Sequence, residues 1–126
     1  MALDKRGRIY LGDSGNARVQ VFDQNGKLVD IWPNIRNVNS CAMDNNDRFW
    51  VGDGNSQRLL QFDQNGHYLY GWGIAGTYPG RFFNINQFSV DTAGNLYTAE
   101  VIGGRVQMFR PKKGADPKQL VAKLFQ

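Results

Sequence analysis

Apolar residues in this chain come in short runs that recur in the same order three times. The runs are rich in Val, Ile, Phe, Tyr and Trp, and clusters of turn-forming residues separate them, a pattern typical of β-strands rather than helices. The spacing of 40 to 47 residues between copies predicts a repeat protein whose units bury their surfaces against their neighbours. In each copy an acidic residue closes one run, Arg follows five positions later, and Phe follows four positions after that: Asp13, Arg18 and Phe22; Asp53, Arg58 and Phe62; Glu100, Arg105 and Phe109.

The runs of each copy predict four antiparallel strands. In the first two copies the second run, residues 9–11 and 49–51, is apolar at consecutive positions, so both faces of that strand should be buried between stacked sheets. The first strand of each copy is expected to end at an acidic turn residue: Asp4, Asp44 or Asp91.

The outer strand of each copy is expected after a turn. Asn25-Gly26 and Asn65-Gly66 predict hairpins in which both central residues take positive φ. The outer strands should then cover residues 27–32 and 67–72, and residues 117–125 are the candidate outer strand of the third copy.

Four-stranded sheets of about 42 residues that stack around an axis form a β-propeller, with one copy per blade. We therefore predict an all-β fold of three four-stranded antiparallel blades in one domain over residues 1–126. Blade 1 is expected over residues 1–33, blade 2 over residues 34–74 and blade 3 over residues 82–126.

Composition adds little to this picture. The chain has 126 residues, 41% of them hydrophobic, which suits one domain with one core, and the scattered net charge of +4 is typical of a surface that favours solubility. The single cysteine, Cys41, cannot form an internal disulfide. We see neither a signal peptide nor a membrane span, so the sequence does not assign a compartment.

The repeated runs resemble NHL repeats, the blades of six-bladed β-propellers. The resemblance rests on residues 9–13, 49–53 and 96–100, each followed by Arg-x-x-x-Phe. Residues 71–91 are also similar to the connection between blades in peptidyl-hydroxyglycine amidating lyases and their bacterial relatives. Residues 104–116 look like the closing blade of bacterial NHL proteins, which implies a natural C-terminus.

The number of repeats departs from this family, because the chain has three where six form a ring. An isolated half-propeller would expose two apolar sheet faces, which soluble monomers rarely do. Two copies related by a 180° rotation would close the ring, with blade 1 of each against blade 3 of the other. We therefore expect a homodimer; the alternative is a fragment of a longer chain.

The resemblance implies a zinc ion held by histidines at the channel mouth of the lyases. The matching positions here are Gln87 and Ser40, which are poor zinc ligands. His67 is expected to be a surface residue next to a turn, and Cys41 a small buried thiol. We accordingly predict no metal, no cofactor and no catalytic residue, with a metal-dependent lyase-like or lactonase-like enzyme as the alternative.

Polar residues should gather where the inner strands begin, at the mouth of the channel. Turn formation explains some of these asparagines, and a ligand site is the other interpretation. The candidate ligand-binding set is Asn37, Asn39, Ser40, Asn84, Asn86 and Gln87.

The charged residues that recur in the copies suggest a structural role rather than a catalytic one. The acidic residues five positions before each Arg recur in every copy, so we expect turn-closing ion pairs. Basic residues beside the aromatic loop at 78–83 leave single-stranded RNA binding as a second alternative, although the charge pattern alone does not favour nucleic acid as a partner. The interpretation we favour is a non-catalytic binding or scaffold module that completes a ring with itself.

Overall fold

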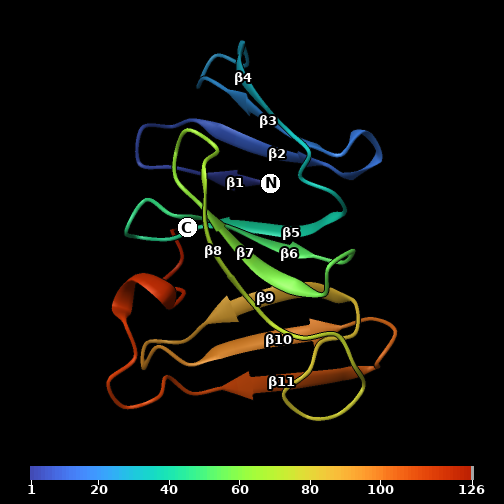
Figure 1. The fold of residues 1–126 in the computed structure, drawn as a ribbon. Helices are drawn as coiled ribbons and strands as arrows, with labels where there is room; N and C mark the ends of the chain where they lie inside the picture. The colour runs from blue at the N-terminus through green and yellow to red at the C-terminus, as the bar shows by residue number, and fades with distance from the viewer. Residues whose placement is uncertain (126) are drawn as a thin grey trace.

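The computed structural model describes residues 1–125 (Figure 1). In this range eleven strands and two single-turn 3-10 helices, η1 and η2, alternate with turns, and the protein is all-β as predicted. No helix within residues 1–125 has the length and apolar character needed to cross a membrane. The elements are β1 (Ala2–Leu3), β2 (Ile9–Asp13), η1 (Ser14–Asn16), β3 (Arg18–Phe22), β4 (Leu28–Pro33), β5 (Val38–Met43), β6 (Phe49–Asp53), β7 (Arg58–Phe62), β8 (Tyr68–Trp72), β9 (Ile85–Val90), β10 (Leu96–Glu100), β11 (Arg105–Phe109) and η2 (Pro117–Gln119).

The strands form three separate antiparallel sheets, each in chain order. Blade 1 is β1-β2-β3-β4, blade 2 is β5-β6-β7-β8, and blade 3 is β9-β10-β11. The first strands of the sheets, β1, β5 and β9, follow one another through the middle of the molecule (Figure 1). This arrangement, with inner strands adjacent and outer strands at the periphery, is that of stacked propeller blades.

Blade 3 has three strands within the described residues, and the expected outer strand over residues 117–125 is wrong. No Asn-Gly hairpin follows Phe109, and Pro111 and Pro117 cannot donate backbone hydrogen bonds to a neighbouring strand. The segment instead forms η2 and crosses to blade 2, where Leu124 forms a bridge with Asp44. The Phe125 N–H donates to the Met43 carbonyl at 2.7 Å.

Five of the turns between strands depend on one aspartate each. One carboxylate oxygen accepts the backbone N–H groups two and four residues later, at 2.8 to 3.1 Å, and the residue three positions later has positive φ. This is an Asx-type turn, in which the side chain replaces a backbone acceptor. The predicted turn role of the strand-end aspartates is confirmed, and two hairpins share it: Asp4, Asp23, Asp44, Asp63 and Asp91.

The expected geometry of the Asn-Gly hairpins is only half right. Gly26 and Gly66 have φ of 80° and 81°, but their preceding asparagines are not in the left-handed region. The aspartate that begins each hairpin holds the turn over four residues, and the strand register shifts by a bulge beside it. Only the glycine therefore needs the left-handed conformation.

Three of these aspartates also connect the turn to the core. The second carboxylate oxygen accepts a hydrogen bond from the aromatic side chain six residues later, at 2.9 to 3.1 Å: Tyr10 to Asp4, Trp50 to Asp44 and Tyr97 to Asp91. Each aromatic side chain lies on the second strand of its blade. The turn, the first strand and the second strand of each blade are thus connected by one carboxylate.

Adjacent blades pack face to face. Alternate residues along a strand point to opposite faces of its sheet, so one set packs on the next blade and the other set on the previous blade. We call the face that packs on the next blade along the chain the leading face, and the face that packs on the previous blade the trailing face. The leading face of blade 1 (Tyr10, Val19, Val21) meets the trailing face of blade 2 (Phe49, Val51, Phe62), and the leading face of blade 2 (Trp50, Leu59) meets the trailing face of blade 3 (Leu96, Phe109).

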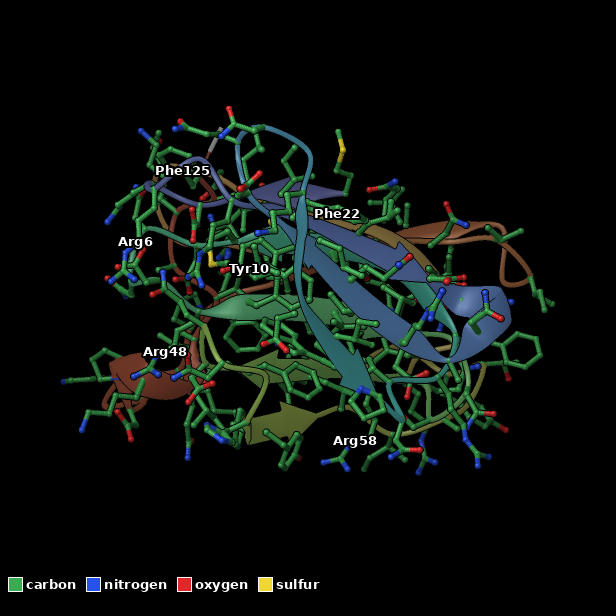
Figure 2. The ribbon with its side chains drawn as sticks, turned by 90° about the horizontal axis from the view of Figure 1, so that it is seen from above. Arg6, Tyr10, Phe22, Arg48, Arg58 and Phe125 are labelled. Atoms are coloured by element: carbon green, nitrogen blue, oxygen red, sulfur yellow. The ribbon has the colours of Figure 1, made fainter. Side chains whose placement is uncertain are left out.

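Aromatic rings dominate the first junction. Tyr10, Trp32 and Phe49 contact one another with ring centroids 5.2 to 5.4 Å apart, and Tyr10 lies within the molecule in Figure 2. Burial of rings of this size contributes roughly 1.5 to 3 kcal/mol each. Close approach also requires a residue without a side chain, because a Cβ on Gly12 would lie 2.5 Å from Val38 Cγ1.

The acidic residue and arginine that recur in every copy form an ion pair in two blades. Arg18 contacts Asp13 at 2.8 Å and Arg105 contacts Glu100 at 3.0 Å. In blade 2 the expectation is wrong, because Arg58 donates to the Gly71 carbonyl at 2.6 Å while Asp53 accepts from Ser56. The ion pair is therefore a local feature of the turn, and in blade 2 both side chains form hydrogen bonds with other groups instead.

Substitution of Asp4 by asparagine should lower the free energy of unfolding by about 1–3 kcal/mol, because an amide NH₂ replaces an oxygen that accepts from the Arg8 and Tyr10 side chains. Urea unfolding measures the effect. Asp23→Asn is the matched control, since only one oxygen of Asp23 accepts hydrogen bonds and asparagine keeps that acceptor. Equal losses in the two variants would contradict this role of the second oxygen.

Acid should also destabilise the fold through Asp4. Burial opposes ionisation, but hydrogen bonds from Arg8, Arg6 and Tyr10 hold the pKa of this carboxyl below its ordinary value of 3.8. A depressed pKa stabilises the folded state at pH values above the unfolded pKa, and the stabilisation is lost as the pH falls through the folded pKa. Unfolding free energies at pH 6 and pH 3 should therefore differ less in Asp4→Asn than in the parent chain.

Candidate functional site

The polar residues expected at the channel mouth begin the inner strands of blades 2 and 3. Asn37 precedes β5 and Asn84 precedes β9, with φ of 52° and 64°. Their carbonyls accept N–H groups from Gly54 and Val101, both at 3.1 Å. Asparagine tolerates left-handed backbone better than most residues, so these two positions have a turn-forming role.

An amide contact joins the two blades at this end. The Asn39 Nδ2 group donates to Asn84 Oδ1 at 2.8 Å and to the Ile85 carbonyl at 2.9 Å. Gln57, from blade 2, also accepts the Asn84 N–H. The two inner strands are thus held together at their start by side-chain amides, in addition to apolar packing.

The remaining predicted residues differ in their access to solvent. Asn86 and Gln87 are exposed on β9, whereas Ser40 is buried on β5. Ser40 pairs with Gly52, and a Cβ on Gly52 would lie 2.5 Å from Ser40 Oγ and 3.2 Å from Ile85 Cγ2. The structure therefore brings Asn39 and Asn84 together, leaves Asn86, Gln87 and Asn37 open to solvent, and places Ser40 between the strands.

The side chains at this mouth do not suit a zinc ion. The positions that correspond to the lyase histidines are an exposed amide, Gln87, and a buried hydroxyl, Ser40, and neither is a usual zinc ligand. Within residues 1–125 no group of three or more His, Cys, Asp or Glu side chains is close enough to hold a metal ion. The two most closely placed amides, Asn39 and Asn84, are hydrogen-bonded to each other.

The only histidine and the only cysteine lie apart from the mouth and from each other. His67 is on the exposed hairpin of blade 2, with its Nδ1 2.9 Å from Asp63 Oδ2. Burial opposes ionisation of Asp63, but hydrogen bonds from His67 and Asn65 lower the pKa of this carboxyl below its ordinary value. Cys41 is half-buried on β5 against the core between blades 1 and 2.

The structure also contains a cavity that sequence analysis missed. It has a volume of about 380 Å³ and lies between the outer strand of blade 2, blade 3 and the segment after β11. Its lining includes Tyr70, Trp72, Leu96, Phe109 and Val121. One feature of the sequence could have indicated this cavity. The Asp-x-Asn-Gly turn that follows Phe22 and Phe62 is missing after Phe109, where the repeat ends.

Comparison with known proteins agrees with this geometry. The chain is an all-β assembly of β-propeller blades, and residues 1–22, which include most of the first blade, match the NHL repeat. The chain as a whole therefore has a β-propeller fold, as the sequence predicts, and the NHL match is confined to residues 1–22. No curated protein matches the chain.

Two solved structures show the same fold. A streptogramin B lyase superposes with a TM-score of 0.62 at 10% identity, over 90% of this chain and 40% of the lyase. The virginiamycin B lyase from Staphylococcus aureus superposes with a TM-score of 0.58 at 7% identity, over 86% of this chain and 39% of that protein. The chain spans about two fifths of the length of these lyases, and identities this low establish shared fold alone.

Replacement of Asn39 by aspartate should weaken the contact between blades 2 and 3, because a carboxylate would face the Asn84 and Ile85 carbonyl oxygens that now accept hydrogen bonds. We expect a loss of about 1–3 kcal/mol in unfolding free energy, with faster amide exchange in β9. Asn86→Asp is the matched control, since Asn86 is exposed. A similar loss in both variants would argue against the amide contact.

Proposed function

We propose that this chain closes a six-bladed ring with a second copy of itself and works as a binding or scaffold module. The observation that carries the proposal is the pair of apolar sheet faces at the two ends of the stack. Blade 2 is covered on both sides, whereas the trailing face of blade 1 and the leading face of blade 3 have no neighbouring blade within residues 1–125.

The trailing face of blade 1 carries apolar side chains at the positions that are buried in the other blades. Leu11 corresponds to Val51 of blade 2 by its place in the second strand, yet Leu11 is 40% exposed and Val51 is fully buried. Ile9 and Phe22 correspond to Phe49 and Phe62 in the same way. The face also includes Leu3, Leu28 and Ile31, which pair with or lie beside these residues.

The leading face of blade 3 shows the same relation to the covered leading faces. Val106 occupies the position of Val19 and Leu59, and it is 70% exposed where they are fully buried. Tyr97 and Met108 occupy the positions of Tyr10 and Val21. Val106 and Met108 would thus be covered by a further blade of the same kind.

The two free faces are therefore the two halves of a junction that the chain already makes twice. Head-to-tail contacts of this kind normally continue without end, but a half-turn per chain closes them after two copies. Two such junctions would bury on the order of 2,000 Å² or more, which is the range of obligate dimers.

In a closed ring the amides at the channel mouth would form a ligand-binding site. The amides of Asn39, Asn84, Asn86 and Gln87 would be present twice, facing one opening. Amides donate and accept hydrogen bonds without carrying charge, which favours recognition of a polar ligand or of a peptide backbone. The six mouth residues remain our candidate ligand-binding set, with Ser40 as a buried supporting residue.

Light scattering tests the ring. The parent chain should elute with twice the chain mass of 14.2 kDa, and Leu11→Asp and Val106→Asp should each yield monomers, because a carboxylate would have to be buried at the junction. Leu69→Asp is the matched control, since Leu69 is an exposed apolar residue of blade 2 whose two faces are already covered. The control should remain a dimer.

A mixture of the two monomeric variants distinguishes a head-to-tail ring from other dimers. One junction of the mixed dimer joins an unmodified trailing face to an unmodified leading face, so mixing should restore part of the association. A folded parent chain that remains a 14.2 kDa monomer would overturn the proposal. So would dissociation by only one of the two substitutions, because both faces take part in every junction.

A further inference from the structure

The cavity beside blade 3 occupies a place where the repeat of the blades is broken. In blade 1 the outer-strand tryptophan, Trp32, lies directly on the hairpin of blade 2, and a Cβ on Gly66 would lie 2.5 Å from its ring. Trp32 is therefore 3% exposed. Its counterpart in blade 2 is Trp72, which by the same relation should lie under a hairpin of blade 3.

Blade 3 has no such hairpin. After Phe109 the chain continues as Arg110-Pro111-Lys112 and passes outward to η2, so the space over Trp72 is left as the cavity. Trp72 and Phe109 form adjoining walls, with ring centroids 5.3 Å apart and planes at 79°. Tyr70 and Leu96 extend the apolar lining, and Val121 and Leu120 complete it from the C-terminal segment.

The size and lining of the cavity suit a small aromatic molecule. A volume of about 380 Å³ lies within the usual range of small-molecule sites, roughly 300–1,000 Å³. The walls lie within one chain at the junction of blades 2 and 3, so the cavity exists whether or not a ring forms. A flat ring system could lie against the wall that Trp72, Phe109 and Tyr70 form, where aromatic contacts add to apolar burial.

The mouth of the cavity is positively charged. Arg110 and Lys112 are exposed residues of its lining, and neither takes part in an ion pair within residues 1–125. The one acidic residue of the lining, Asp116, accepts the Lys118 N–H at 2.9 Å as the cap of η2, and the two cations outnumber its charge. An anionic group at the mouth would therefore meet two free cations.

From the apolar walls and the cationic mouth we infer that this cavity binds a flat aromatic anion, a carboxylate or a sulfonate. The ring system inserts against Trp72 and Phe109, and the anionic group contacts Arg110 and Lys112 at the surface. This site is separate from the channel mouth and goes beyond the proposed scaffold role, because it adds a small-molecule ligand on the outer rim.

Nuclear magnetic resonance of the full chain tests the inference with 2-naphthoate as the probe. The three tryptophans give three indole N–H signals, and Trp72→Phe identifies the signal of Trp72. Addition of 2-naphthoate should shift that signal in a saturable way, while the signal of Trp32, which is buried in the junction of blades 1 and 2, should move little.

Two sets of variants distinguish the contribution of the charged residues to binding from that of the apolar walls. Arg110→Gln combined with Lys112→Gln should weaken 2-naphthoate binding about 3- to 10-fold and leave the neutral isostere 2-naphthamide unchanged. Lys113→Gln is the matched control, because Lys113 is the adjacent residue but does not line the cavity. Ala115→Leu, which adds bulk to the lining, should weaken both probes.

Several results would overturn the inference. These are the absence of a Trp72 shift up to the solubility limit of 2-naphthoate, equal shifts of all three indole signals, and equal affinity for the acid and the amide. The surface variants Arg110→Gln and Lys112→Gln keep the test valid if Ala115→Leu fails to fold, because exposed polar substitutions seldom affect stability.

Discussion

Every blade of this protein depends on burial of both of its faces. A four-stranded antiparallel sheet that is apolar on both sides is not stable alone in water, because its large side chains gain free energy only when another sheet removes them from solvent. The middle blade meets this requirement fully: Phe49, Trp50 and Val51 are consecutive residues on one strand, and all three are fully buried. The terminal blades meet it on one face each, so the described residues form a fully covered central blade with one uncovered sheet face at each end.

Aspartate turns keep the stacked sheets in register. Each turn positions a strand end by its first carboxylate oxygen, and three of them fix the neighbouring aromatic ring by the second oxygen. The aromatic residue that packs on the next blade is thereby oriented by the same group that ends the previous strand. Local turn chemistry and packing between blades are coupled in this way, which explains why Asp and aromatic residues recur together at the same spacing.

Features that repeat in every blade could be predicted from the sequence, and features that occur once could not. Short apolar runs and their turn residues recur three times, so the strands of blades 1 and 2 were found within a residue or two. The path of the C-terminal segment could not be found, because Leu124 pairs with Asp44 through contacts distant in sequence that leave no periodic signal. Asn37 and Asn84 were correctly placed at strand entries. The burial of Ser40 was missed, because it depends on how closely Gly52 lets β6 and β9 approach.

Glycine at the end of the second strand determines how closely two blades meet. Gly12 leaves room for Val38 of blade 2 and Gly52 leaves room for Ile85 of blade 3, whereas the corresponding residue of blade 3 is Ala99. A methyl group in that place would hold the blade of a second copy farther away than in the two junctions within the chain. A ring of two copies would then have four close junctions and two wider ones. Its central opening would be elongated, with twofold rather than sixfold symmetry, and a ligand on the axis would fit best if it were longer in one direction than in the other.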